Sequence, residues 1–233
     1  MVFLPLILVP INHILNYTLV TFEHVYFEKD KSLILKDINF FIKNKHTGVI
    51  GSNGSGKSSL LRLIKKIEKP SSGKLYTDHS YSLIFQNPDH QILCPTVKDE
   101  LCFGQIEMGN PIDIINSKLN QLLSKYQVNY LLNKTTHELS EGEKQLVCIL
   151  SALMDESDII LFDEPFSSLD LKNQKKFMKL ILKLPQPIIM ATHQLDLLEG
   201  FDEVIWLENG QIKSIGPADK TVNQYRKYVI GKK

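Results

Sequence analysis

The segment from Gly51 to Ser58 constrains the fold more than any other part of the chain. Its residues, GSNGSGKS, fit the phosphate-binding pattern G-x-x-x-x-G-K-[ST] and follow an apolar run that ends at Ile50. A run of helix-forming residues, 60–67, comes next. A strand, a glycine-rich loop and a helix in this order place backbone N–H groups and a helix N-terminus around a bound phosphate. The sequence therefore predicts a nucleotide-binding α/β domain.

The loop residues have expected parts in phosphate binding. Lys57 can reach the β- and γ-phosphates, and the Ser58 hydroxyl can bind Mg²⁺. The residues expected to hold the phosphates are Gly51, Ser52, Asn53, Gly54, Ser55, Gly56, Lys57, Ser58 and Ser59. A flexible surface loop is the alternative interpretation, and the flanking strand and helix argue against it.

The composition is that of a globular protein. Hydrophobic residues make up 43% of the 233 residues and charged residues 23%, so we expect a packed core. The formal net charge of +1 gives no overall positive field for nucleic acid, and no nucleic-acid partner is predicted. Cys94, Cys102 and Cys148 lie far apart without C-x-x-C spacing, which favours reduced thiols over a zinc site and places Cys148 in the core.

The two ends of the chain differ from its middle. Residues 1–17 form an apolar arm without a charged side chain, in which Pro5 and Pro10 interrupt any helix. The arm lacks the basic start of a signal peptide, and its polar residues argue against a membrane span. Two interpretations stay open, an arm that packs on the domain or on a partner and a misassigned start codon. Residues 217–233 are expected to form a short, basic, solvated tail.

Hydrophobic periodicity predicts the order of the elements between these ends. Strands are expected at 18–27, 38–42, 47–50, 81–85, 159–162 and 188–191, with a hairpin at 204–215 around Asn209-Gly210. Helices are expected at 60–67, at 112–126, after Ser140, and at 171–184, where five lysines form a solvated face. We expect an α/β domain over 18–216 that is interrupted by a helical subdomain at about 87–150.

Two carboxylates follow one of the predicted buried strands. Asp163 and Glu164 end the run DIILFDE and precede Pro165. Asp163 can support Mg²⁺ through its water shell, and Glu164 can act as the general base that polarises an attacking water. Adjacent carboxylates are common on surfaces, but a pair directly after a buried strand and downstream of a phosphate loop favours a site.

The segment LSEGEKQ, residues 139–145, opens an apolar helix. Ser140 and Glu143 have the spacing of a capping box. A serine hydroxyl at a helix N-terminus also suits an anion, and the two interpretations are compatible.

Six motifs in this order resemble those of the ATPase subunit of an ABC (ATP-binding cassette) transporter. They are the Walker A motif GSNGSGKS, the Q-loop glutamine in LIFQNPDHQ, the signature LSEGEKQ, the Walker B run IILFDE, the D-loop SSLD and the switch histidine in MATHQ. The resemblance spans about residues 19–216. It implies an α/β P-loop core, with a mixed sheet, an antiparallel β edge and an inserted helical subdomain. It also implies an ATPase that uses ATP and Mg²⁺ to drive transport.

The same resemblance assigns roles around the bound nucleotide. Gln86 joins Ser58 as a Mg²⁺ ligand, and Asp163 supports the ion through water. Glu164 is the expected catalytic base, and His193 is expected to contact the γ-phosphate and the attacking water.

Further residues are implied to act across a pair of ATPase subunits. Ser140 and Gly142 would face the γ-phosphate of ATP bound to the opposite subunit, and Asp170 would link the two sites. A second ATPase subunit is therefore an expected partner, and a homodimer and a heterodimer both stay open.

The region after the Q-loop is similar to that of the energy-coupling factor (ECF) group, which imports vitamins or cobalt and nickel ions. The segments FQNPDHQ (85–91) and TVKDELCFG (96–104) correspond to FQNPDNQ and TVEDDVAFG in that group. The similarity implies a transmembrane coupling protein and a membrane substrate-binding protein as partners, at the cytoplasmic face of the cell membrane. The coupling groove of such proteins would lie at about 86–103.

Three positions depart from the family pattern, and at one of them Leu146 stands where arginine is common. Glu141 stands in the signature where glycine is usual, and a carboxylate near the γ-phosphate could weaken ATP binding or shift the loop. The aromatic residue that stacks on adenine would fall on Lys29, and Phe27 is expected in the strand core instead. These departures fit a degenerate member of a heterodimer as well as a working homodimer. The retained Walker B glutamate and switch histidine favour a chain that hydrolyses ATP.

Other classes remain as alternatives. One is the ATPase of another class of ABC transporter. A soluble ABC ATPase in DNA repair or translation would carry coiled-coil insertions or two cassettes, and this chain shows neither. An unrelated P-loop kinase or GTPase would lack the signature and the D-loop.

Overall fold

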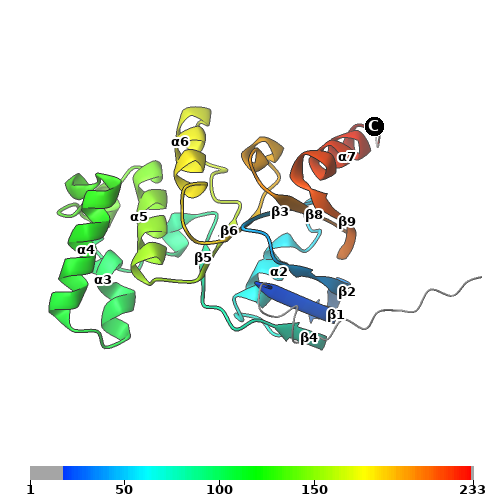
Figure 1. Ribbon diagram of the computed structural model, residues 1–233, viewed down its shortest axis with the longest axis horizontal. Coiled ribbons are helices and arrows are strands. Elements are labelled where there is room, and N and C mark those ends of the chain that lie inside the picture. Colours follow the sequence, from blue (N-terminus) through cyan, green and yellow to red (C-terminus); the bar gives the residue numbers. More distant parts are fainter. Residues whose placement is uncertain (1–17, 232–233) are drawn as a thin grey trace, which may run out of the picture.

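The computed structural model describes residues 18–231 (Figure 1). The apolar arm at 1–17, and both interpretations of it, lie outside the described residues. Within 18–231, no helix combines the length and the hydropathy that crossing a bilayer requires.

A three-stranded antiparallel sheet forms the first layer. It contains β1 (Val20–Lys29), β2 (Ser32–Ile42) and β4 (Ser72–Tyr76) in the order β2-β1-β4. Alternate residues of β1 point into the core, and the Phe22 ring stacks on that of Phe40 with centroids 4.9 Å apart. Phe27 is 5% exposed, so the prediction that it belongs to the strand core is confirmed.

A six-stranded sheet carries the phosphate loop. Its strands are β3 (His46–Ile50), β5 (Tyr81–Ile84), β6 (Ile159–Asp163), β7 (Ile188–Ala191), β8 (Glu203–Glu208) and β9 (Gln211–Pro217). The order is β5-β6-β7-β3-β8-β9, parallel except for β9. The residues of β6 and β7 are all buried, which explains why these strands read as continuous apolar runs. The predicted mixed architecture is confirmed. The carboxyl ends of β3, β6 and β7 lie side by side.

Three helices beyond the edge strand β5 occupy the left end of the view in Figure 1, and they share a hydrophobic core with the six-stranded sheet. They are α3 (Val97–Glu107), α4 (Ile112–Tyr126) and α5 (Glu141–Met154), with the short 3₁₀ turns η2 (Pro88–His90), η3 (Asn129–Leu131) and η4 (Thr136–Glu138). The bounds of α4 are those predicted from its periodicity. Leu101, Leu119, Leu123 and Val147 are buried between these helices, and Cys148 lies in the same core as predicted.

Two helices flank the site. The helix α2 (Lys57–Ile64) starts in the phosphate loop and ends earlier than the predicted residue 67, because Lys66 has a left-handed backbone with φ of 62°. The helix α6 (Leu171–Ile181) ends before the predicted residue 184, so it carries four of the five predicted lysines, and Lys183 follows its end. All five lysines are exposed, as expected. The 3₁₀ turn η5 (Leu195–Leu198) follows β7.

The hairpin between β8 and β9 supports the phosphate loop. Its turn residues, Asn209 and Gly210, have φ of 52° and 78°, as the primed hairpin turns require. The Gly210 N–H donates to the Ser55 carbonyl (3.1 Å), and the Gly210 carbonyl accepts from the Lys36 N–H (2.8 Å). The predicted hairpin is confirmed, and it ties the loop to β2.

The expected solvated tail was wrong for the described residues. Residues Ala218–Gly231 form the helix α7, which packs on β8. The rings of Tyr225 and Tyr228 lie edge-on to Trp206, with centroids 5.3 and 4.9 Å away. Val222 is buried on the same face. The three-residue spacing of these side chains gives the helix one apolar side, while its basic residues face solvent.

Candidate functional site

The phosphate loop begins where β3 ends and requires glycine at two positions. Gly51 has φ of 152°, and a Cβ there would lie 1.9 Å from the Leu207 carbonyl oxygen. Gly56 has φ of 104°, and a Cβ there would lie 2.5 Å from Leu35. No side chain among the described residues caps the N-terminus of α2. Its first N–H groups therefore remain available to an anion.

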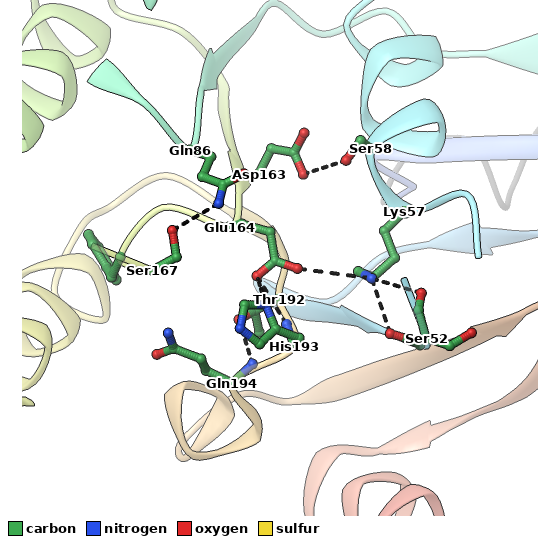
Figure 2. A network of polar contacts seen from close by, with 12 residues as sticks. Ser52, Lys57, Ser58, Gln86, Asp163, Glu164, Ser167, Thr192, His193 and Gln194 are labelled. Atoms are coloured by element: carbon green, nitrogen blue, oxygen red, sulfur yellow. Dashed lines mark hydrogen bonds and ion pairs between the residues drawn. The ribbon is translucent and has the colours of Figure 1, made fainter. Parts of the chain in front are cut away.

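Lys57 and Ser58 lie on the first turn of α2 and point toward the ends of the neighbouring strands (Figure 2). Lys57 is 7% exposed, and its Nζ donates to the carbonyls of Gly51 (3.1 Å) and Ser52 (3.2 Å). The Ser58 Oγ donates to Asp163 Oδ1 at 2.9 Å. This bond joins the Walker A and Walker B motifs, which are 105 residues apart in the chain.

The two carboxylates at the end of β6 have different environments. Asp163 is 8% exposed, and burial raises its pKa above the usual range for aspartate, although the hydrogen bond from Ser58 opposes the shift. Glu164 has a left-handed backbone with φ of 52°, and its N–H donates to the Ala191 carbonyl at 2.9 Å. A non-glycine residue in this region is strained and is kept there by its surroundings. The strained turn directs the Glu164 side chain toward the segment after β7.

His193 holds the Glu164 carboxylate. The ring Nδ1 lies 2.8 Å from Glu164 Oε2, and the His193 backbone N–H donates to the same oxygen at 3.1 Å. The other oxygen, Oε1, lies 3.9 Å from Lys57 Nζ. Thr192 secures the turn, since its N–H donates to the Val49 carbonyl and its hydroxyl accepts from the Gln194 N–H. The base expected from the sequence is thus oriented by two hydrogen-bond donors of His193.

Gln86 follows β5 and reaches the D-loop. Its Nε2 donates to Ser167 Oγ at 3.1 Å. Because β5 is the parallel neighbour of β6 and pairs Ile84 with Phe162, Gln86 and Asp163 stand at the carboxyl ends of adjacent strands, and Ser58 contacts Asp163. A hydroxyl, an amide and a carboxylate therefore stand at this edge of the sheet. Oxygen donors of these kinds are the ligands that Mg²⁺ prefers.

The signature residues lie elsewhere. Figure 1 shows α5 apart from α2, and none of the residues that line the groove around Ser140 and Gly142 belongs to the phosphate loop. A groove of about 310 Å³ contains both residues together with Glu141 and Asp170. The predicted capping box of Ser140 and Glu143 is confirmed.

Asp170 begins α6 as its N-cap. Its Oδ1 accepts from the N–H groups of Lys172 (2.9 Å) and Asn173 (3.0 Å), and its Oδ2 accepts from the Asn173 side chain. These bonds, those of Asn173 first, hold the pKa of Asp170 below its usual range. The carboxylate faces solvent in the groove that also contains the signature.

Glu208 was not predicted as part of this region. It is 8% exposed at the end of β8, and its Oε1 accepts from the Ser52 hydroxyl of the phosphate loop at 3.3 Å. Its Oε2 accepts from the Trp206 indole N–H at 3.4 Å. The sequence offered one signal for Glu208, namely its position directly before the Asn209-Gly210 turn. Only the pairing of β3 with β8, however, places Glu208 beside Ser52.

A family model described as ABC transporter matches residues 35–167. The chain belongs to the ABC transporter family. The resemblance inferred from the six motifs is confirmed, and the chain is an ATP-binding subunit of the kind that hydrolyses ATP to power transport.

Similar proteins cover almost the whole chain. The biotin transport ATP-binding protein BioM of Rhodobacter capsulatus is 35% identical over 214 residues, which cover 87% of this chain and 92% of the relative. The energy-coupling factor transporter ATP-binding protein EcfA1 of Ureaplasma parvum is 33% identical, covering 89% of this chain and 77% of the relative. The solved structure of cbiO1 from Clostridium perfringens, part of the ABC transporter complex cbiONQ, superposes with a TM-score of 0.80. It is 30% identical and covers 92% of this chain and 94% of its own.

Proposed function

We propose that this ABC ATPase energises an ECF-type importer for a vitamin or a transition-metal ion. Relatives named for biotin transport and for energy-coupling factor transport support this assignment. The segment FQNPDHQ after the Q-loop supports it from the sequence. The partners in this proposal are a second ATPase subunit, a transmembrane coupling protein and a membrane substrate-binding protein, with the ATPases at the cytoplasmic face of the membrane.

The contact between Glu164 and His193 is the observation that carries the catalytic part of the proposal. Glu164 accepts the proton of the attacking water, because its carboxylate stands at the end of β6 beside the phosphate loop. His193 keeps that carboxylate oriented and contacts the γ-phosphate through its exposed ring, of which 53% is accessible. Lys57 exchanges the loop carbonyls for the β- and γ-phosphates when ATP binds.

The oxygen donors at the strand ends fit a divalent ion. In the proposal Ser58 and Gln86 bind Mg²⁺ directly, and Asp163 supports it through water. When bound, the ion neutralises charge that develops on the phosphates during the reaction. Asp163 is suited to this part because its buried carboxylate is held beside the Ser58 hydroxyl at 2.9 Å.

The hydrolytic site is completed by a second subunit in this proposal. Ser140 and Gly142 at the N-terminus of α5 meet the γ-phosphate bound to the other subunit, and a helix N-terminus suits that charge. Asp170 lies in the same groove and links the two sites. Because no phosphate-loop residue of the same chain lines the groove with the signature, the proposal uses a second subunit to bring the two together.

Co-purification tests the assembly. The chain with Glu164→Gln is tagged, expressed in its own host and extracted gently from membranes with ATP. We expect a polytopic coupling protein and a small substrate-binding membrane protein, whose identity gives the solute. A second ATPase in the same complex would establish a heterodimer. Recovery of soluble or ribosomal partners alone would overturn the transport proposal.

A further inference from the structure

The N-terminus of α5 already holds an anion from its own chain. The Ser140 hydroxyl donates to Glu143 Oε2 at 2.9 Å, and the Ser140 backbone N–H donates to the same oxygen at 3.0 Å. A serine has one hydroxyl hydrogen and one backbone N–H. Both donors that Ser140 could offer to a phosphate are therefore in use.

A lysine from another segment binds the opposite oxygen of the same carboxylate. Lys134 Nζ lies 2.6 Å from Glu143 Oε1, and the two side chains are 35% and 21% exposed. The backbone of Lys134 is anchored to α3, because its carbonyl accepts from the Val97 N–H at 3.1 Å. The hydrogen bond from Lys134, followed by that from the Ser140 backbone, holds the pKa of Glu143 below its usual range. The charged Glu143 carboxylate is thus bound through one oxygen by Ser140 and through the other by Lys134.

The other charges of the groove do not contact Ser140 in this way. Glu141 accepts from the Ser168 hydroxyl at 3.3 Å, and Asp170 accepts from the first turn of α6. Lys176 is the one basic residue among those that line the groove. A phosphate that enters the groove meets several carboxylates. To reach the donors of Ser140, it must displace the Glu143 carboxylate that is bound to them.

We propose that Glu143 is a positioning residue that occupies the donors of Ser140 until a phosphate of ATP on the second subunit replaces it, while Lys134, already bound to the other oxygen, keeps hold of the released carboxylate. This inference rests on the proposed function, because it requires Ser140 to meet that phosphate. The exchange substitutes one anion for another at a helix N-terminus, so the helix remains capped throughout. The contact sets how much ATP is needed to join the two subunits.

Substitutions at the two ends of the contact have opposite effects. Glu143→Gln keeps the shape and an acceptor oxygen but removes the charge, so Ser140 is released more easily. We expect the KM for ATP of the purified transport complex to fall by about threefold to tenfold. Lys134→Met removes the group that holds the released carboxylate away from Ser140, and we expect KM to rise by about threefold. In the double variant, the lysine substitution no longer raises KM.

Glu138→Gln is the matched control. Glu138 forms the same kind of capping box with Thr135 on η4, where its Oε2 accepts from the Thr135 N–H and hydroxyl. It lies outside the residues that line the groove. We expect its KM to equal that of the unchanged protein. ATP binding to the isolated subunit should be the same for Glu143→Gln and Glu138→Gln, since neither residue contacts the phosphate loop.

Ser140→Ala separates failure of this inference from failure of the proposed function. If Ser140→Ala leaves KM and kcat of the complex unchanged, the signature does not meet a phosphate, and the composite site and this inference both fail. If Ser140→Ala impairs turnover but Glu143→Gln leaves KM unchanged or raises it, the composite site stands and the displaced carboxylate is overturned. If Glu143 only stabilised the helix cap, Glu143→Gln would raise KM. If Glu143 competes with the phosphate for Ser140, the same substitution lowers KM, so the sign of the change distinguishes the two roles.

Discussion

His193 Nδ1 lies 2.8 Å from Glu164 Oε2, across the carboxyl ends of the neighbouring parallel strands β7 and β6. The backbone N–H of His193 donates to the same oxygen, so the carboxylate is held from two directions. Glu164 itself sits in a left-handed conformation that its hydrogen bond to Ala191 maintains. The pair therefore depends on the register of two strands rather than on a mobile loop.

Glu164→Gln should abolish turnover while ATP still binds. The amide keeps the size of the side chain but cannot accept a proton, and losing a general base costs about 10²- to 10⁴-fold in rate. Phosphate release measured at saturating ATP, with nucleotide binding by calorimetry, checks both parts. Glu107→Gln, an exposed carboxylate at the end of α3, is the control. Unchanged steady-state hydrolysis in Glu164→Gln would remove Glu164 from the role of base.

Asp163→Asn should stabilise the nucleotide-free protein while it disables Mg²⁺-dependent hydrolysis. Burial raises the pKa of Asp163, so the folded state binds the proton more tightly than the unfolded state. The charged form is then a cost to folding at neutral pH, and removing it should add about 1 kcal/mol to the free energy of unfolding. The Asn oxygen can still accept the hydrogen bond from Ser58.

The pH dependence of that difference provides a second check. The contribution of a group with a raised folded pKa is fully favourable below its unfolded pKa and is lost as pH rises through the folded pKa. The increase in the free energy of unfolding caused by Asp163→Asn should therefore be largest at neutral pH. It should shrink as pH falls below the folded pKa of Asp163. Urea unfolding at a series of pH values measures it. A variant that is less stable at neutral pH would contradict the cost of the buried charge.

The site could be predicted from the sequence where it depends on local pattern. The residues Lys57, Asp163 and His193 each follow an apolar run, and the carboxyl ends of parallel strands meet at one edge of a sheet. The capping box of Ser140 and Glu143 is likewise local, because its members are three residues apart. These features needed no knowledge of which strands are neighbours.

Contacts that depend on strand order could not be predicted in the same way. Glu208 reaches Ser52 only because β8 pairs with β3, and the two residues are 156 positions apart. The strand β4 was missed because most of its residues are exposed, so it lacks an alternating apolar pattern. The packing of α7 was missed because the sequence of the helix alone does not show that its apolar side faces Trp206.

Gly51→Ala and Gly54→Ala should differ in their effects although both glycines have positive φ. A Cβ at Gly51 would lie 1.9 Å from the backbone oxygen of Leu207, which cannot move without shifting β8. A Cβ at Gly54 meets nothing within 4 Å, so only the strain of the left-handed backbone, about 1 kcal/mol, remains. Gly51→Ala should lose ATP binding and stability together. Equal unfolding midpoints for the two variants would show that the loop adapts at Gly51.

Tyr228→Ala should loosen α7 without affecting the nucleotide site. The Tyr228 ring lies edge-on to Trp206 and also has Lys213 Nζ 3.8 Å from its centroid, so truncation removes an aromatic pair and a cation–π contact. Because Tyr228 is half-buried, we expect a loss of about 1–2 kcal/mol in the free energy of unfolding.

Trp206 is the one tryptophan in the sequence, so its fluorescence reports both unfolding in urea and the exposure of Trp206 in the folded state. The exposed neighbour Val229→Ala should change stability by less than about 0.5 kcal/mol and leave the emission unchanged. Emission of Tyr228→Ala identical to that of Val229→Ala would place α7 away from β8 in solution.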